Sequence, residues 1–145
     1  MILEDYLNSM DAFDRYKGHQ LREFISDLTV DHKVEINDVN SMFYARGFYA
    51  EELTDKLYYF GKVNIKVVEL IKDDGGKLEC ITIANIKTSS IIEVELTLGR
   101  DREVGIQIKF KDGTDLIFHN KEDSDGKNNI SAGNQIKSIY SLLTE

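Results

Sequence analysis

The feature that most limits the possible folds of this chain is a change in its apolar periodicity near residue 57. From there on, apolar and polar residues alternate along several short segments, which is the period of half-buried strands. In IIEVELTL, for example, Ile92, Val94, Leu96 and Leu98 share one face, and the residues between them are polar. This alternation is typical of antiparallel sheets with one face toward water. We therefore expect about six to seven antiparallel strands in this part of the chain.

The first of the long alternating segments is VNIKVVELI, in which Val63, Ile65, Val67 and Ile71 fall on one face. The turn-forming residues of Asp73–Gly76 follow, and then a second strand-like segment, KLECITIANI. Two strand-like segments separated by acidic and glycine residues predict a hairpin.

The hairpin predicted in GIQIKFKDGTDLIF has a register that the apolar pattern decides. A two-residue turn would set apolar residues opposite polar ones. A three-residue loop at Lys111–Gly113 instead pairs Ile108 with Leu116 and Ile106 with Phe118. We therefore predict a type I turn followed by a left-handed glycine in a bulge.

Both ends of the chain have the 3–4 spacing of amphipathic helices. Two N-terminal stripes are formed by Leu3, Tyr6, Leu7, Met10 and Phe13, and by Leu21, Phe24, Ile25 and Leu28. Between them, basic residues followed by Gly18 are typical of a helix end, so two short helices are expected. A C-terminal stripe is formed by Ile136, Ile139, Tyr140 and Leu143, and Ser131 is its expected N-cap. This last helix should pack on the face of the final hairpin.

Residues 37–55 fit either a helix or a strand with a glycine kink, and AEELTD at their end favours a helix. Seven of the 14 aromatic residues lie between positions 43 and 60. They either pack in the core or form an interaction surface, because aromatic side chains often anchor interfaces. The candidate surface residues are Phe43, Tyr44, Phe48, Tyr49, Tyr58 and Tyr59.

Length and charge suggest one acidic domain over residues 1–145, with a mainly helical extension (1–55) before a β-core and helix (56–145). Residues 1–55 hold 12 acidic and 5 basic residues, whereas residues 56–145 hold 14 and 13, for a net charge of -8. This charge argues against nucleic acid and anionic lipid as partners. No signal peptide or membrane span is expected, and the single cysteine, Cys80, fits a cytoplasmic protein.

The densest group of potential ligands is HNKEDSDGKNNISAGN, residues 119–134. An EF-hand register with Gly126 at the sixth position fails, because Lys121 and Ala132 occupy positions that require oxygen ligands. A solvated connector is the expected role, with an unusual calcium site as the alternative. The histidines are too far apart to predict zinc, and Glu51-Glu52 on a helix would not face each other. No catalytic, cofactor-binding or metal-binding residue is predicted, and we expect no enzymatic activity.

In order, the strand-like segments, ITIANIKTSSI and GIQIKFKDGTDLIF among them, lead to a closing helix. Over about residues 57–143 this order resembles the bacterial pleckstrin-homology-like (PH-like) domain, as in small uncharacterised bacterial proteins with such a β-core. The resemblance implies an α+β fold with a curved sheet or open barrel, capped by the C-terminal helix. It also implies a binding function, toward proteins or lipid headgroups. The candidate headgroup hairpin carries four basic and four acidic residues, so phosphoinositide binding is not expected.

The resulting expectation is a nonenzymatic, cytoplasmic protein-interaction module without a cofactor, whose partner is another protein or a second copy. Two alternatives are a protein that binds a small apolar ligand between sheet and helix, and an immunity- or antitoxin-like inhibitor of a basic protein.

Overall fold

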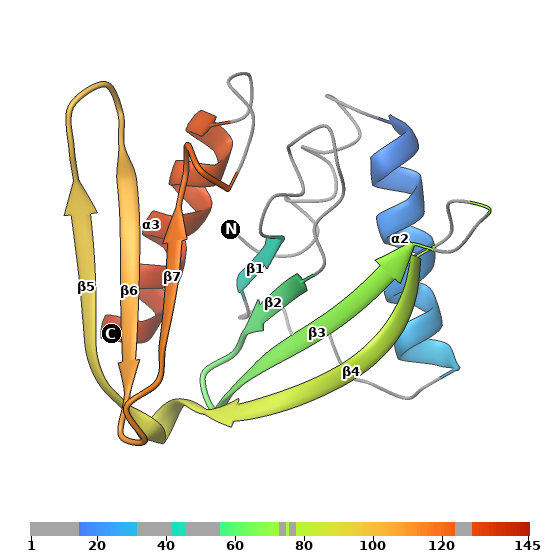
Figure 1. The fold of residues 1–145 in the computed structure, drawn as a ribbon, viewed down its shortest axis with the longest axis horizontal. Helices are drawn as coiled ribbons and strands as arrows, with labels where there is room; N and C mark the ends of the chain where they lie inside the picture. The colour runs from blue at the N-terminus through green and yellow to red at the C-terminus, as the bar shows by residue number, and fades with distance from the viewer. Residues whose placement is uncertain (1–14, 32–41, 46–55, 73–74, 76–77, 124–128) are drawn as a thin grey trace.

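A computed structural model describes residues 15–31, 42–45, 56–72, 75, 78–123 and 129–145 (Figure 1). Its elements are α2 (Arg15–Val30), β1 (Met42–Ala45), β2 (Lys56–Phe60), β3 (Asn64–Lys72), β4 (Leu78–Lys87), the 3-10 turn η1 (Thr88–Ser90), β5 (Ile91–Leu98), β6 (Val104–Phe110), β7 (Asp115–His119) and α3 (Asn129–Thr144). Neighbouring strands pair antiparallel in two sheets, β1-β2-β3-β4 and β5-β6-β7. The predicted α+β class is confirmed, and the described strands form two open sheets instead of a closed barrel.

The chain crosses from one sheet to the other at η1, between β4 and β5 (Figure 1). Thr88 fixes this corner to the β2–β3 turn, because its Oγ1 donates to the carbonyl of Lys62 at 2.7 Å. On the other side, the Lys111 N–H donates to the Ser90 carbonyl at 2.8 Å. Hydrogen bonds from both adjacent hairpins therefore hold the two sheets at a defined angle.

The β6–β7 hairpin has the predicted three-residue loop. Ile106 pairs with Phe118 and Ile108 pairs with Leu116, as the apolar pattern requires. Gly113 has a φ of 90°, in the left-handed region that residues with a side chain rarely adopt. The predicted register is confirmed. It forms because only this register keeps all four apolar residues on one face.

The side chain of Asp112 stabilises this loop, and its contribution to the free energy of unfolding should depend on pH. Its Oδ1 accepts hydrogen bonds from the Thr114 hydroxyl at 2.6 Å and the Thr114 N–H at 2.9 Å. These bonds lower the pKa of the Asp112 carboxyl. A depressed folded-state pKa adds stability above the unfolded-state pKa, about 3.9, and that stability is lost as the pH falls through the folded-state value.

Asp112→Asn keeps an acceptor oxygen but does not titrate. We expect wild type to be the more stable protein at pH 7, and the difference in unfolding free energy to shrink as the pH falls below the unfolded-state pKa of about 3.9. Urea unfolding at a series of pH values measures this difference. A difference that stays constant across the series would contradict the role given to Asp112.

The core lies between the two sheets and α3. Its buried members are Tyr58, Phe60, Ile65, Val104, Ile106, Ile108, Phe110, Phe118, Ile136 and Ile139, and Leu116, Tyr140 and Leu143 pack against them. Helix α3 contacts β1, β5, β6 and β7, and it lies across one face of the three-stranded sheet (Figure 1). The predicted packing of the last helix on the last hairpin is confirmed. Ser131 is not the N-cap, however, because α3 begins at Asn129.

Helix α2 contacts β4, on the side of the four-stranded sheet away from the three-stranded one (Figure 1). Its predicted stripe, from Leu21 to Leu28, is buried. The predicted helix end at Gly18 is wrong, because α2 runs from Arg15 through this residue. An internal glycine costs about 1 kcal/mol, which is less than burying one large apolar side chain contributes. The first predicted stripe, residues 3–13, lies outside the described residues.

The four-stranded sheet has apolar residues on both faces, which the alternation in β3 did not predict. Ile65 is buried in the core, but Val68 and Leu70, on the opposite face, are buried as well. Val63 and Ile71, which the alternation placed on the same face as Ile65, are 69% and 50% exposed. Val63 precedes the strand, and Ile71 lies at its far end, away from the three-stranded sheet. The ambiguous region contains strand β1, and AEELTD lies outside the described residues.

Candidate functional site

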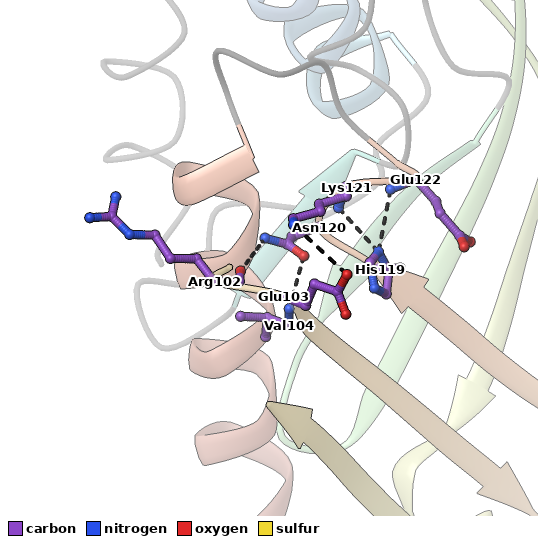
Figure 2. Close-up of polar contacts among 7 residues, drawn as sticks. All are labelled: Arg102, Glu103, Val104, His119, Asn120, Lys121 and Glu122. Carbon is purple, nitrogen blue, oxygen red and sulfur yellow. Dashed lines mark hydrogen bonds and ion pairs between the residues drawn. The ribbon is translucent and has the colours of Figure 1, made fainter. Parts of the chain in front are cut away.

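The turn that follows β7 is built around the side chain of Asn120, which is fully buried (Figure 2). Its Oδ1 accepts from the Val104 N–H at 2.9 Å, and its Nδ2 donates to the Arg102 carbonyl at 2.9 Å. Its backbone N–H donates to the Val104 carbonyl at 3.0 Å. Asn120 is thus the next position of the β6–β7 ladder. The side-chain oxygen serves as the acceptor for Val104 at the point where the chain turns away.

His119 and Asp123 close the same turn. The Asp123 Oδ2 accepts from the His119 N–H at 2.7 Å, and the Asp123 N–H donates to the His119 carbonyl at 2.9 Å. The His119 Nδ1 accepts from the N–H groups of Lys121 at 3.2 Å and Glu122 at 3.4 Å (Figure 2). An Nδ1 that accepts assigns the ring proton to Nε2. The Nδ1 lone pair is therefore directed at the backbone of its own turn.

This geometry gives residues 119–123 a structural role. Asp123 is only 6% exposed, so this part of the expected connector is a packed turn with buried side chains. Nowhere in the described ranges do three or more His, Cys, Asp or Glu side chains group in a way that could hold a metal ion. Residues 124–128, which contain the remaining candidate calcium ligands, lie outside those ranges.

Helix α3 approaches this turn closely at Gly133. A Cβ added there would lie 3.2 Å from Val104 Cγ2 and 3.3 Å from Asn120 Nδ2. Both distances are shorter than usual carbon contacts, so a glycine lets the helix backbone cover the buried amide.

The neighbouring β5–β6 turn contains backbone strain. Asp101 and Arg102 have φ values of 55° and 63°, and the Glu103 N–H donates to the Arg100 carbonyl at 3.2 Å. Two consecutive positive φ values are the pattern of a type I′ turn, for which glycine or asparagine is preferred. Strain of this kind costs on the order of 1 kcal/mol for a residue such as arginine.

Arg102→Gly should remove that strain while preserving the carbonyl that Asn120 contacts. We expect the unfolding free energy to rise by about 0.5–1 kcal/mol, since the greater freedom of glycine in the unfolded chain offsets part of the gain. Arg100→Gly is the matched control and should not stabilise, because Arg100 does not have a positive φ. Thermal unfolding of both variants checks the prediction, and equal effects would contradict it.

Strand β5 has an open edge. Its only partner among the described strands is β6. The Gly99 N–H donates to the Glu103 carbonyl at 2.9 Å, which sets the alternation of the antiparallel ladder. By that alternation Glu93, Glu95 and Thr97 bond to β6, whereas the N–H and C=O groups of Val94, Leu96 and Leu98 point outward. The outward groups could pair with an added strand.

The side chains of β5 differ from the alternation expected from the sequence. Val94 and Leu96 are partly buried against the core, but Ile92 is 62% exposed and Leu98 is 63% exposed. The ladder shifts by one residue between Ile91 and Glu93, so Ile92 is the extra residue of a β-bulge. Ile91 packs against the core in the position that the alternation assigned to Ile92. Leu98 lies at the strand end.

The outer face of the three-stranded sheet is mostly polar, with Ile117 as an exposed apolar residue. Lys109 Nζ lies 3.6 Å from Glu93 Oε2, and Gln107 Nε2 donates to Asp115 Oδ2 at 2.8 Å. Glu95 lies opposite Gln107 in the ladder. The strand at the other edge is β7. One of its outward backbone groups, the His119 N–H, already donates to the Asp123 carboxylate. The β5 edge has no such closure among the described residues.

The aromatic residues chosen as a candidate surface are divided by the structure. Tyr58 and Tyr59 are 2% and 5% exposed, so their side chains are inside the molecule and do not form a surface. Phe43 and Tyr44 lie in β1, and their Cα atoms pair with those of the two tyrosines. The other two candidates, Phe48 and Tyr49, lie outside the described residues. Sequence reasoning missed the β5 edge, because the alternation in IIEVELTL does not show which strand lies at the edge of a sheet.

The remaining residues considered for chemistry lie far from one another. His19 is on α2, where its Nε2 is 3.2 Å from Glu23 Oε1. Cys80 is in β4, paired with Leu70 of β3. His32 and Glu51-Glu52 lie outside the described residues. No described helix has the length and apolar content needed to cross a membrane. Comparison of the chain with protein-family models, curated proteins and solved structures gives no match.

Proposed function

We propose that this protein is a nonenzymatic, cytoplasmic protein-interaction module with a PH-like core, and that it binds an extended segment of its partner along β5. The architecture supports the PH-like part of this proposal. Four strands and then three strands form two antiparallel sheets, and a C-terminal helix follows. The headgroup-binding role of such domains is not part of the proposal, because the chain is acidic.

The observation that carries the proposed function is the β5 edge, which no other described strand pairs with. At three successive outward positions, Val94, Leu96 and Leu98, the backbone donors and acceptors have no ladder partner among the described residues. An added strand would satisfy these groups and would cover apolar surface that is only partly buried in the single chain. Strand addition of this type derives affinity from main-chain hydrogen bonds and specificity from alternate side chains.

Two features of the described residues support binding over catalysis. In the turn after β7, the Asn120 amide, the Asp123 carboxylate and the His119 Nδ1 all make hydrogen bonds within the chain. The space between the sheets and α3 is occupied by core side chains such as Phe60 and Phe118, which gives the apolar-ligand alternative no support. An inhibitor of a basic protein remains the second candidate, and the net charge of -8 favours it.

Leu98→Pro provides a test of strand addition. The N–H of Leu98 points away from β6, so proline removes an outward donor and no intrachain hydrogen bond of the described ladder. We expect wild-type protein to capture a host protein that Leu98→Pro does not retain. Hydrogen exchange at Val94, Leu96 and Leu98 should slow when that protein binds.

Ile117→Ala is the matched control, since Ile117 is 54% exposed on β7. It should capture the same protein as wild type. Equal retention by Leu98→Pro, or protection confined to another surface, would contradict the proposed function. For the inhibitor candidate, the captured protein should be basic and should lose its own activity in the complex.

A further inference from the structure

We propose that the segment bound at β5 carries basic and aliphatic side chains in alternation. This inference rests on the proposed function and specifies the chemistry of the partner. It follows from what the two faces of the three-stranded sheet would present to a strand lying beside β5.

On the outer face, the neighbours of the added strand would be two carboxylates. Glu93 and Glu95 are exposed, and both point to the polar side of the sheet. Lys109 Nζ lies 3.6 Å from Glu93 Oε2, but the residue opposite Glu95 is the neutral Gln107. Opposite charges on adjacent strands attract, and like charges repel. Lysine or arginine is therefore the side chain that suits the outer face of the partner strand.

On the inner face, the neighbours of the added strand would be apolar. Val94 and Leu96 are half-buried against the core that α3 also covers, and Leu98 is exposed beside them. An aliphatic side chain next to these residues would extend the apolar layer. Because side chains in a strand alternate between faces, basic and aliphatic residues must alternate in the partner.

The charges on β5 disfavour a second copy of this chain as the partner. Strand β5, IIEVELTL, contains no basic residue that could face Glu93 and Glu95. An antiparallel alignment centred on Leu96 would set Glu95 beside Thr97 and Glu93 beside Gly99, without a basic neighbour, and one centred on Val94 would set Glu93 of one copy beside Glu95 of the other. Such like-charge neighbours destabilise strand pairing. The structure therefore points to a different, basic strand.

Two synthetic peptides of about seven residues test the inference, one alternating Lys with Val and one alternating Glu with Val. Fluorescence anisotropy measures their affinity for the full chain at about 0.15 M salt. We expect the Lys peptide to bind at least about tenfold more tightly. Glu95→Lys should weaken that binding about tenfold. Glu122→Lys changes the net charge equally but lies on the turn after β7, and it should have no effect.

Each other outcome has a defined meaning. Equal binding of both peptides that Leu98→Pro abolishes would overturn the basic pattern and leave strand addition intact. Binding of the Lys peptide that neither Leu98→Pro nor Glu95→Lys weakens would show general attraction to an acidic chain and would overturn the inference. Binding of neither peptide would also overturn it, while the capture experiment decides the proposed function separately. Self-association in place of peptide binding would identify a second copy as the partner.

Discussion

Phe118→Ala should destabilise the protein by about 3–5 kcal/mol, which is a large fraction of the roughly 5–15 kcal/mol that holds a typical domain folded. Phe118 is 1% exposed. Its ring centroid lies 4.7 Å from that of Tyr58 and 5.9 Å from that of Phe60, both at steep interplanar angles. Phe118 belongs to β7 and the two partners belong to β2, so this side chain joins the two sheets. Its loss would leave a cavity at their junction.

Urea unfolding followed by circular dichroism measures this loss. Ile117→Ala is the neighbouring control, because Ile117 is 54% exposed on the opposite face of β7. We expect it to cost less than about 1 kcal/mol. If Phe118→Ala were no more destabilising than Ile117→Ala, the packing of the two sheets described here would be wrong.

Asn120→Ala should cost about 2–4 kcal/mol, although it removes only a small polar side chain. The substitution leaves the Val104 N–H without its acceptor at 2.9 Å and the Arg102 carbonyl without its donor at 2.9 Å. The bond to the Val104 N–H is buried, so water cannot readily replace the lost acceptor, whereas the bond to the Arg102 carbonyl is part-buried. Each unsatisfied buried group costs about 1–3 kcal/mol.

The control for Asn120→Ala is Asn134→Ala, on the exposed side of α3. Alanine favours helix, so this substitution should be neutral or slightly stabilising. Calorimetric unfolding of both variants gives the comparison. A cost below about 0.5 kcal/mol for Asn120→Ala would mean that the amide is not the structural centre of the turn.

The parts of the fold that could be predicted are those decided by local pattern. The β6–β7 register followed from four apolar residues and one glycine, because any slip would expose the apolar set. The stripe that includes Ile136 and Ile139 predicted which face of α3 packs on the sheet, because any other face would leave these residues exposed. In these segments, local preference and tertiary packing agree.

The rest depended on interactions between distant residues. Gly18 looked like a helix end, but packing of the stripe from Leu21 onward keeps the helix continuous through it. The bulge at Ile92 has no local sign, because IIEVELTL alternates without interruption. Tyr58 belongs to the core and not to an aromatic surface, because residues distant in sequence bury its side chain. Asn120 is an ordinary turn residue in sequence, and its importance comes from Val104, which is 16 residues away.

Residue-resolved amide exchange in the unbound full chain tests the central claim most directly, since the proposed function requires an open β5 edge. We expect the amides of Val94, Leu96 and Leu98 to exchange rapidly, and those of Glu93, Glu95 and Thr97, bonded to β6, to exchange slowly. Slow exchange at all six positions would show that the edge is already covered, and it would contradict strand addition at β5.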